Sequence, residues 1–232
     1  MHHIFREVVL ANDRVPIENP LVPVDGMYRM DLDALAAQVG PRTRALLLCN
    51  PHNPVGRAWS HTELEQLSRF CLERDILVVS DEVYYALLHR GTTYTPFANV
   101  SPAASMNAVT VTSASKSFNL TGLKHSLVIA ENPDILEAYD RGQRKSNAYY
   151  GGSTMGIVAT EAAMTHGDVW VQQLMTHVEN TDHFSGTGSS SKPPKSPSST
   201  RRRPTSPGLT AAAWACTTIN SCRGWRRRPT SS

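Results

Sequence analysis

The chain has 232 residues, 40% of them hydrophobic and 19% charged, which is enough for one sizeable core or two small ones. It contains no apolar run of roughly 18 residues, as a membrane helix needs, and no basic-then-apolar N-terminal segment of the kind that signals secretion. All 20 acidic residues precede residue 183, whereas nine of the 23 basic residues follow it. The formal charge of +3 therefore divides into −6 for residues 1–182 and +9 for residues 183–232, which predicts a mildly acidic body and a basic tail.

Helices and strands are predicted to alternate along the body. A short helix is expected over residues 31–38 and a longer one over 60–74, where Ser60 and Glu63 form a capping-box pattern. Continuous apolar runs predict buried strands at 45–49, 76–80, 108–112 and 126–130. Further helix starts are indicated at Asn132, Ser153 and Asp168. This order predicts an α/β fold with a mostly parallel sheet and helices on both of its faces.

The composition changes near residue 183. Residues 186–199 consist only of Ser, Gly, Pro, Lys and Thr, and the sequence Arg-Arg-Arg-Pro-Thr-Ser at 201–206 recurs at 226–231. Such a stretch buries too little apolar surface to offset the entropy of an ordered chain. We therefore expect a folded body over residues 1–182 and a disordered, low-complexity basic tail over 183–232.

The cysteines and histidines indicate neither a disulfide framework nor a metal site. Four cysteines lie at unrelated spacings, and Cys49 and Cys71 fall in segments that are predicted to be buried. The nine histidines show no metal-ligand spacing, so no metal is expected. Buried free thiols fit a reducing, cytoplasmic environment.

Polar loops follow three of the predicted strands. Their sequences are Asn-Pro-His-Asn-Pro-Val-Gly at 50–56, Asp-Glu-Val-Tyr-Tyr at 81–85 and Ser-Ala-Ser-Lys-Ser-Phe-Asn at 113–119. In open α/β sheets, ligands bind outside the carboxyl ends of the strands. The three loops therefore predict one binding site at this edge of the sheet.

Taken in order, the three loops resemble the large domain of class I/II aminotransferases, which have the type I fold of pyridoxal-phosphate enzymes. Finer details resemble the cystathionine β-lyase and cysteine-S-conjugate β-lyase branch, namely the His52 position, the segment 116–119 and the Tyr-Tyr-Gly-Gly-Ser-Thr-Met-Gly sequence at 149–156. The resemblance covers roughly residues 3–180. It implies a homodimeric enzyme that binds pyridoxal 5'-phosphate and a small amino-acid substrate.

The resemblance assigns the reactive end of the cofactor to two side chains. Lys116 matches the lysine that forms the Schiff base and later moves the Cα proton. Asp81 matches the carboxylate that keeps the ring nitrogen protonated, whereas the adjacent Glu82 is expected to point elsewhere. In a protein outside this family, Lys116 would be an ordinary surface lysine and Asp81 a helix N-cap.

Four further side chains match the remaining cofactor contacts. Asn53 and Tyr84 match the donors to the phenolic oxygen of the ring, although a turn asparagine and a half-buried core tyrosine are the ordinary alternatives. Ser113 matches a phosphate-binding hydroxyl. Lys124 lies where many relatives have an arginine, so it would hold phosphate as a point charge without a bidentate contact. An ordinary surface role is the alternative for Lys124.

The resemblance also implies that the chain is truncated at both ends relative to the family. The family's upstream segment, with a phosphate-binding helix N-terminus, and its C-terminal small domain, with the arginine for the substrate carboxylate, have no counterpart here. Loss of the upstream segment is expected to expose apolar surface and to weaken cofactor binding. The Arg-Pro-Thr-Ser composition of the tail suggests a frame-shifted reading of a G+C-rich gene, which is a hypothesis.

Several functions stay open from the sequence. The favoured hypothesis is a carbon–sulfur β-lyase that acts on cystathionine or cysteine S-conjugates and releases pyruvate, ammonia and a thiol. Transamination uses the same lysine and aspartate and is the alternative chemistry. A non-catalytic fragment is a third possibility. Nucleic-acid binding through the basic tail is a minor one, because no binding motif or aromatic platform accompanies the charge.

Overall fold

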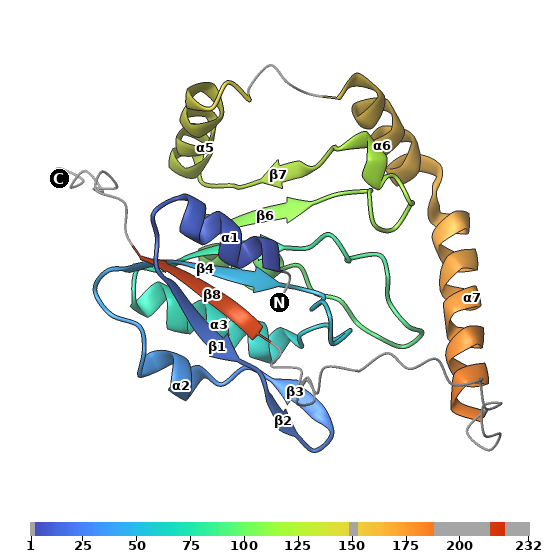
Figure 1. Ribbon diagram of the computed structural model, residues 1–232, viewed down its shortest axis with the longest axis horizontal. Helices are drawn as coiled ribbons and strands as arrows, with labels where there is room; N and C mark the ends of the chain where they lie inside the picture. The colour runs from blue at the N-terminus through green and yellow to red at the C-terminus, as the bar shows by residue number, and fades with distance from the viewer. Residues whose placement is uncertain (1–2, 149–152, 188–213, 221–232) are drawn as a thin grey trace, which may run out of the picture.

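The computed structural model describes residues 3–148, 153–187 and 214–220 and places them around a six-stranded sheet with the strand order β1-β8-β4-β5-β6-β7 (Figure 1). A separate hairpin consists of β2 (Val22–Val24) and β3 (Met27–Arg29). The strands of the main sheet are β1 (Pro16–Pro20), β4 (Thr43–Cys49), β5 (Leu77–Asp81), β6 (Ala108–Thr112), β7 (Leu127–Ile129) and β8 (Trp214–Asn220).

Helices connect and flank these strands, which confirms the predicted α/β class. They are α1 (His3–Ala11), α2 (Leu32–Ala36), α3 (His61–Glu73), α4 (Pro102–Met106), α5 (Pro133–Lys145), α6 (Thr154–His166) and α7 (Asp168–Thr187). The capping box predicted at Ser60 and Glu63 is present at the start of α3. Within the described part of the chain, no helix is both long and apolar enough to cross a membrane.

The sheet is mixed, which corrects the expectation of a mostly parallel one. The pairs β4–β5 and β5–β6 are parallel, whereas β6–β7, β4–β8 and β1–β8 are antiparallel. The parallel part contains the strands that carry the three polar loops. The carboxyl ends of β4, β5 and β6 therefore meet at one edge of the sheet, as predicted, whereas β7 and β8 run in the opposite direction.

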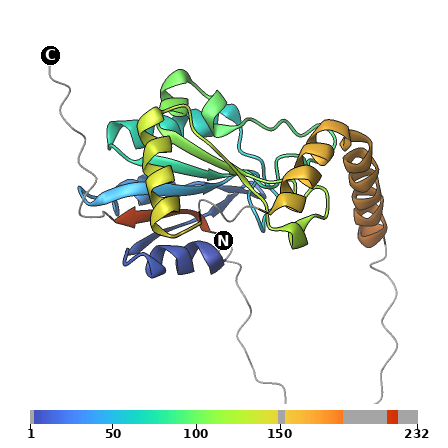
Figure 2. The same ribbon diagram turned by 90° about the horizontal axis from the view of Figure 1, so that it is seen from above.

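The core lies between the sheet and α3. Leu64 and Leu67 of α3, Leu46 and Leu48 of β4 and Val78 of β5 all have 0% exposed surface. Burial of each such side chain contributes about 1.5–3 kcal/mol to folding. Seen from above, α3 and α4 cover one face of the sheet and α1 lies on the opposite face (Figure 2), where Val9 is buried.

Apolar side chains are exposed on several of the helices. Helix α6 is the clearest case, because Gly156 and Thr160 are its only buried residues. Its exposed apolar residues, together with those of α1 and the start of α7, are Ile4, Val8, Leu10, Met155, Ile157, Val158, Met164, Val169 and Trp170. Exposed apolar area of this kind favours association with another apolar surface.

Two parts of the predicted tail have regular structure, which corrects the expectation of disorder from residue 183 onward. Helix α7 continues to Thr187, and residues 214–220 form β8 between β1 and β4. The sequence Trp-Ala-Cys-Thr-Thr-Ile-Asn is rich in residue types that favour strands, a local signal that the average composition of the tail concealed. Residues 188–213 and 221–232 lie outside the described residues, so disorder there stays a prediction.

Proline at the centre of β8 is expected to destabilise the fold. Thr217 pairs with Glu18 of β1 and with Leu47 of β4, and proline removes an N–H from this doubly paired strand. Thr217→Pro should therefore lower the free energy of unfolding by about 2 kcal/mol or more, whereas Thr217→Ala, which keeps the N–H, should cost less than half as much. Urea unfolding followed by circular dichroism measures both. Equal midpoints for the two variants would argue against a paired β8.

Candidate functional site

Strands β4, β5 and β6 end at the same edge of the sheet. Cys49 at the end of β4 is in register with Asp81 at the end of β5, and Asp81 is in register with Val111 of β6. The loops that follow these strands therefore begin side by side. The strand ends and these loops carry all the predicted site residues except Lys124, which lies shortly before β7.

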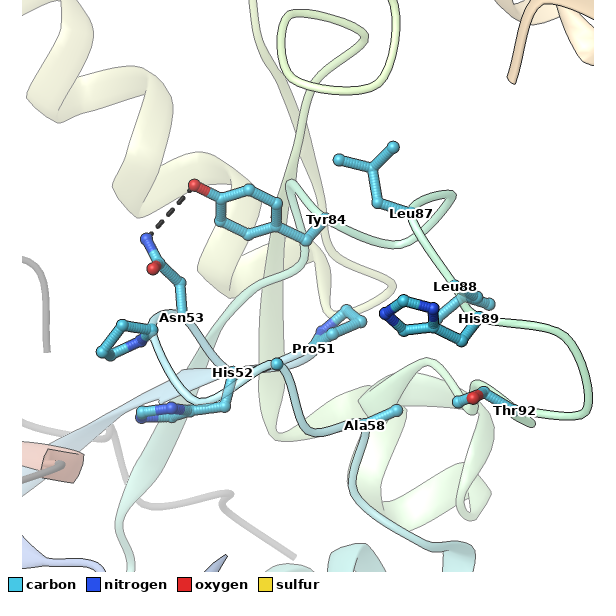
Figure 3. A pocket seen from close by; sticks show the side chains of 11 residues that line it. Pro51, His52, Asn53, Ala58, Tyr84, Leu87, Leu88, His89 and Thr92 are labelled. Atoms are coloured by element: carbon cyan, nitrogen blue, oxygen red, sulfur yellow. Dashed lines mark hydrogen bonds between the residues drawn. The ribbon is translucent and has the colours of Figure 1, made fainter. Parts of the chain in front are cut away.

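Asn53 and Tyr84 come together across this edge. Asn53 Nδ2 donates a hydrogen bond to Tyr84 Oη at 3.2 Å, and both side chains line a cavity of about 160 Å³ (Figure 3). Because Tyr84 Oη accepts this bond, its own proton is free to be donated elsewhere. Burial, and then the nearby Cys49 and Asp81, raise the pKa of Tyr84, so the phenol remains protonated near neutral pH.

Asp81 is half-buried at the carboxyl end of β5. Its Oδ1 accepts a hydrogen bond from the backbone N–H of Val83 at 3.3 Å, and residues 83–86 form turns. These turns, and not a helix, directly follow Asp81, so the helix N-cap interpretation of this residue is wrong. The carboxylate lies near Tyr84 and contributes to the raised pKa of that phenol.

Cys49 supports the Asn53 loop, a role that the sequence did not reveal. Its Sγ accepts a hydrogen bond from Asn53 N at 3.4 Å and donates one to Pro51 O at 3.3 Å. The side chain is only 7% exposed. Burial raises the pKa of the Cys49 thiol from 9.0 to about 12, so the thiol stays neutral and holds the loop through both contacts.

The neutral state of Cys49 leads to a reactivity prediction. At pH 8, a thiol pKa of about 12 leaves about 1,000-fold less thiolate than the ordinary value of 9.0. Alkylation of Cys49 by iodoacetamide should therefore be slow in the folded chain and should reach the ordinary rate in urea. Peptide mass spectrometry at a series of times measures this rate at Cys49. Equal rates in the folded and unfolded chains would contradict the buried thiol.

Ser113 and Lys124 are the residues predicted to hold the phosphate of the cofactor. Ser113 is 3% exposed, its Oγ accepts from Ser115 N at 3.0 Å, and it donates to His125 O at 2.6 Å. Its hydroxyl must therefore turn away from His125 before it can donate to a phosphate. Lys116 and Lys124 are exposed, and Lys124 has a left-handed backbone conformation, with φ of 52°.

Helices α6 and α7 brace the loop that carries these groups. Thr160 Oγ1 lies 2.8 Å from His125 Nδ1, and Trp170 Nε1 donates to Ser117 O at 3.2 Å. A Cβ at Gly156 would lie 2.7 Å from His125 Cβ, so the glycine allows the close approach of α6. These contacts join residues that are 35 and 53 positions apart, and sequence patterns alone do not indicate them.

The sequence of the chain matches a known family. The family model for aminotransferase class I and II matches residues 3–182. The chain belongs to the class I and II aminotransferase family. Cystathionine beta-lyase PatB of Bacillus subtilis is 37% identical over 177 residues, a match that covers 75% of this chain and 45% of PatB.

Solved structures of class I and II aminotransferase relatives have the same fold. The PLP-bound C-S lyase from Staphylococcus hominis matches with a TM-score of 0.71 and 28% identity, covering 78% of this chain and 45% of the other. N-succinyldiaminopimelate aminotransferase from Mycobacterium tuberculosis matches with a TM-score of 0.64 and 32% identity, covering 72% and 43%. The chain therefore spans less than half the length of these relatives, and the matches include both lyases and aminotransferases.

Proposed function

We propose that this chain forms the cofactor-binding core of a pyridoxal-phosphate-dependent carbon–sulfur β-lyase. Its substrates would be cystathionine or cysteine S-conjugates, and its products pyruvate, ammonia and a thiol. The similarity to PatB and to the Staphylococcus hominis C-S lyase supports the reaction class. The observation that carries the proposal is the hydrogen-bonded pair of Asn53 and Tyr84 next to Asp81, at the strand edge from which the Lys116 loop begins.

Pyridoxal phosphate, when bound, supplies an electron sink for the bond that is broken at the substrate Cα. Lys116 would hold the cofactor through its amine and then take the Cα proton. The exposed position of Lys116 leaves its amine accessible for both tasks, and no hydrogen bond or ion pair to another described residue restrains it. Asp81 would hold a proton on the ring nitrogen, because a carboxylate beside that nitrogen raises its pKa.

Asn53 and Tyr84 would act as one donor unit toward the phenolic oxygen of the ring. The Asn53 amide polarises the Tyr84 hydroxyl, and such a chain strengthens the hydrogen bond that the phenol donates in turn. Because the pKa of Tyr84 is raised, this donor keeps its proton. The hydrogen bond between Asn53 and Tyr84 supports this shared role.

Ser113 and Lys124 would hold the phosphate. Lys124 supplies a point charge, and Ser113 supplies a hydroxyl once it turns from His125. We further propose that the active enzyme is a cytoplasmic homodimer, a proposal that the exposed apolar residues of α6 support.

The test begins with titration of the purified chain with pyridoxal phosphate. A visible absorbance band that borohydride converts into a stable peptide adduct would support cofactor binding. Incubation with cystathionine and no added 2-oxo acid should then release pyruvate. Absence of the band at millimolar cofactor would identify the chain as a non-catalytic fragment and would contradict the proposal.

Transamination is the second candidate, and the similarity to N-succinyldiaminopimelate aminotransferase favours it. The same residues would hold the cofactor and move the Cα proton, but the amino group of the substrate would be transferred by way of the cofactor to a 2-oxo acid. Product formation that requires a 2-oxo acid, without pyruvate release from cystathionine alone, would support transamination over β-elimination.

A further inference from the structure

A buried carboxylate lies next to the half-buried Asp81 and has no role in the proposed chemistry. Glu82 is 2% exposed. Its Oε1 accepts hydrogen bonds from Ser80 Oγ at 2.7 Å and from Phe97 N at 2.9 Å, and its Oε2 accepts one from Tyr94 Oη. The side chain therefore joins the end of β5 to a segment that lies 12 to 15 residues further along the chain.

The backbone of Glu82 joins the end of β5 to β6. Glu82 N donates to Val111 O at 2.8 Å, and Thr112 Oγ1 donates to Glu82 O at 3.3 Å. Thr112 directly precedes Ser113, the first residue of the loop that carries Lys116. Glu82 thus contacts the ends of two strands whose loops both carry predicted cofactor contacts.

Asn50 also holds the segment of residues 94–97. It is 0% exposed, and its Nδ2 donates to Thr95 O at 2.9 Å while its backbone N–H donates to Asp81 O at 2.9 Å. Residues 94–97 are therefore fastened from β4 through Asn50 and from β5 through Glu82. The stretch between Asp81 and this segment contains Tyr84.

The electrostatics of Glu82 favour a fixed geometry. A buried carboxylate is costly unless donors surround it, and here the donors are two hydroxyls and one backbone N–H. No described cation forms an ion pair with it, so its orientation depends on these directional bonds. Burial, and then Glu82 itself, raise the pKa of Tyr94, so Tyr94 keeps the proton that it donates.

We propose that Glu82 is a positioning residue of the cofactor site. By fastening residues 94–97 across the ends of β5 and β6, it fixes the path of residues 82–87 and so the orientations of Asp81 and Tyr84. The inference rests on the proposed function for its effect on the cofactor, whereas its effect on the loop is independent of any ligand.

The test compares three variants of the full chain, each with two readouts. Glu82→Gln replaces an acceptor by a donor, Tyr94→Phe removes one bond, and Asn107→Ala is the control. Asn107 Nδ2 donates to Ile76 O at 2.8 Å, near the opposite end of β5, so its loss should destabilise the fold without disturbing the site. The readouts are amide hydrogen exchange without ligand and absorbance titration with pyridoxal phosphate.

In Glu82→Gln and Tyr94→Phe, exchange should accelerate at least tenfold in residues 83–87 and 94–97, with no such change in Asn107→Ala. The dissociation constant of pyridoxal phosphate should rise about tenfold, and the pH midpoint of its visible band should move. Adding Tyr94→Phe to Glu82→Gln should give little further effect, because the two changes break the same contact.

Two results separate the failure of this inference from the failure of the proposed function. If exchange accelerates as expected while no variant, nor the parent chain, shows a visible band, the loop role holds and the cofactor proposal fails. If the parent binds the cofactor but Glu82→Gln matches Asn107→Ala in exchange, affinity and pH midpoint, Glu82 is merely structural and the inference is overturned.

Discussion

Replacement of Lys116 by alanine is expected to abolish covalent attachment of pyridoxal phosphate. A Schiff base needs a primary amine at the cofactor aldehyde, and Lys116 is the amine in the loop that follows β6 beside Ser113 and Ser115. After borohydride reduction, peptide mass spectrometry should find the adduct on Lys116 in the parent chain and on no lysine in the variant. The loss should be at least 100-fold in trapped cofactor, since the remaining non-covalent contacts leave nothing for borohydride to fix.

Two other lysines supply the controls for this experiment. Lys145, at the end of α5, is exposed, and Lys145→Ala should trap cofactor as the parent does. Lys124→Ala should still form the adduct but should need a higher cofactor concentration, because only the phosphate loses a charge. Equal trapping in the parent and in Lys116→Ala would show that the assignment of the lysine is wrong.

Asp81→Asn is expected to have the second-largest effect. The substitution keeps the shape of the side chain and removes the charge that would hold a proton on the ring nitrogen. A charge-assisted hydrogen bond contributes about 1.5–3 kcal/mol, so the dissociation constant of the cofactor should rise by roughly 10- to 150-fold. Product formation should fall further, because a neutral ring is a poorer electron sink.

The matched control for Asp81 is Asp33→Asn on α2. Asp33 is exposed and lies away from the strand ends, so its substitution should change neither cofactor affinity nor the visible spectrum. The stability of Asp81→Asn, measured by urea unfolding without ligand, should stay close to that of the parent. Unchanged affinity and spectrum in a folded Asp81→Asn chain would remove Asp81 from the site.

The predicted parts of the fold are those with a strong local signal. The apolar runs at 45–49, 76–80 and 108–112 became β4, β5 and β6, because strands in the middle of a sheet are apolar on both faces. The polar loops after these strands could also be predicted, because their sequences differ sharply from the apolar runs before them. Local signals could not give the direction of β7 or the position of β8, since strand pairing depends on partners far away in the sequence.

In the candidate site, too, local sequence signals could be predicted, whereas contacts between distant residues could not. Asn53, Asp81 and Tyr84 were predicted as site residues from the family resemblance, and the structure places them at one edge of the sheet. Cys49, Glu82 and His125 were missed as supporting residues, because each acts through contacts that a motif does not encode. His125, for example, reaches Thr160 of α6, which lies 35 residues away.

The position of α6 would link association of the chain to the proposed anion binding at the Ser113 loop. One side of the helix contacts His125 through Gly156 and Thr160, whereas the other side exposes Met155, Ile157 and Val158. Any surface that covers these side chains would stabilise α6 in its contact with His125. It would therefore also stabilise the Ser113 loop, which lies behind His125. Thermodynamic reciprocity then requires that an anion which orders this loop strengthens the association by the same factor. In the proposed homodimer, the apparent affinity of the Ser113 loop for an anion would therefore depend on protein concentration, even though this loop and the exposed side of α6 share no residue.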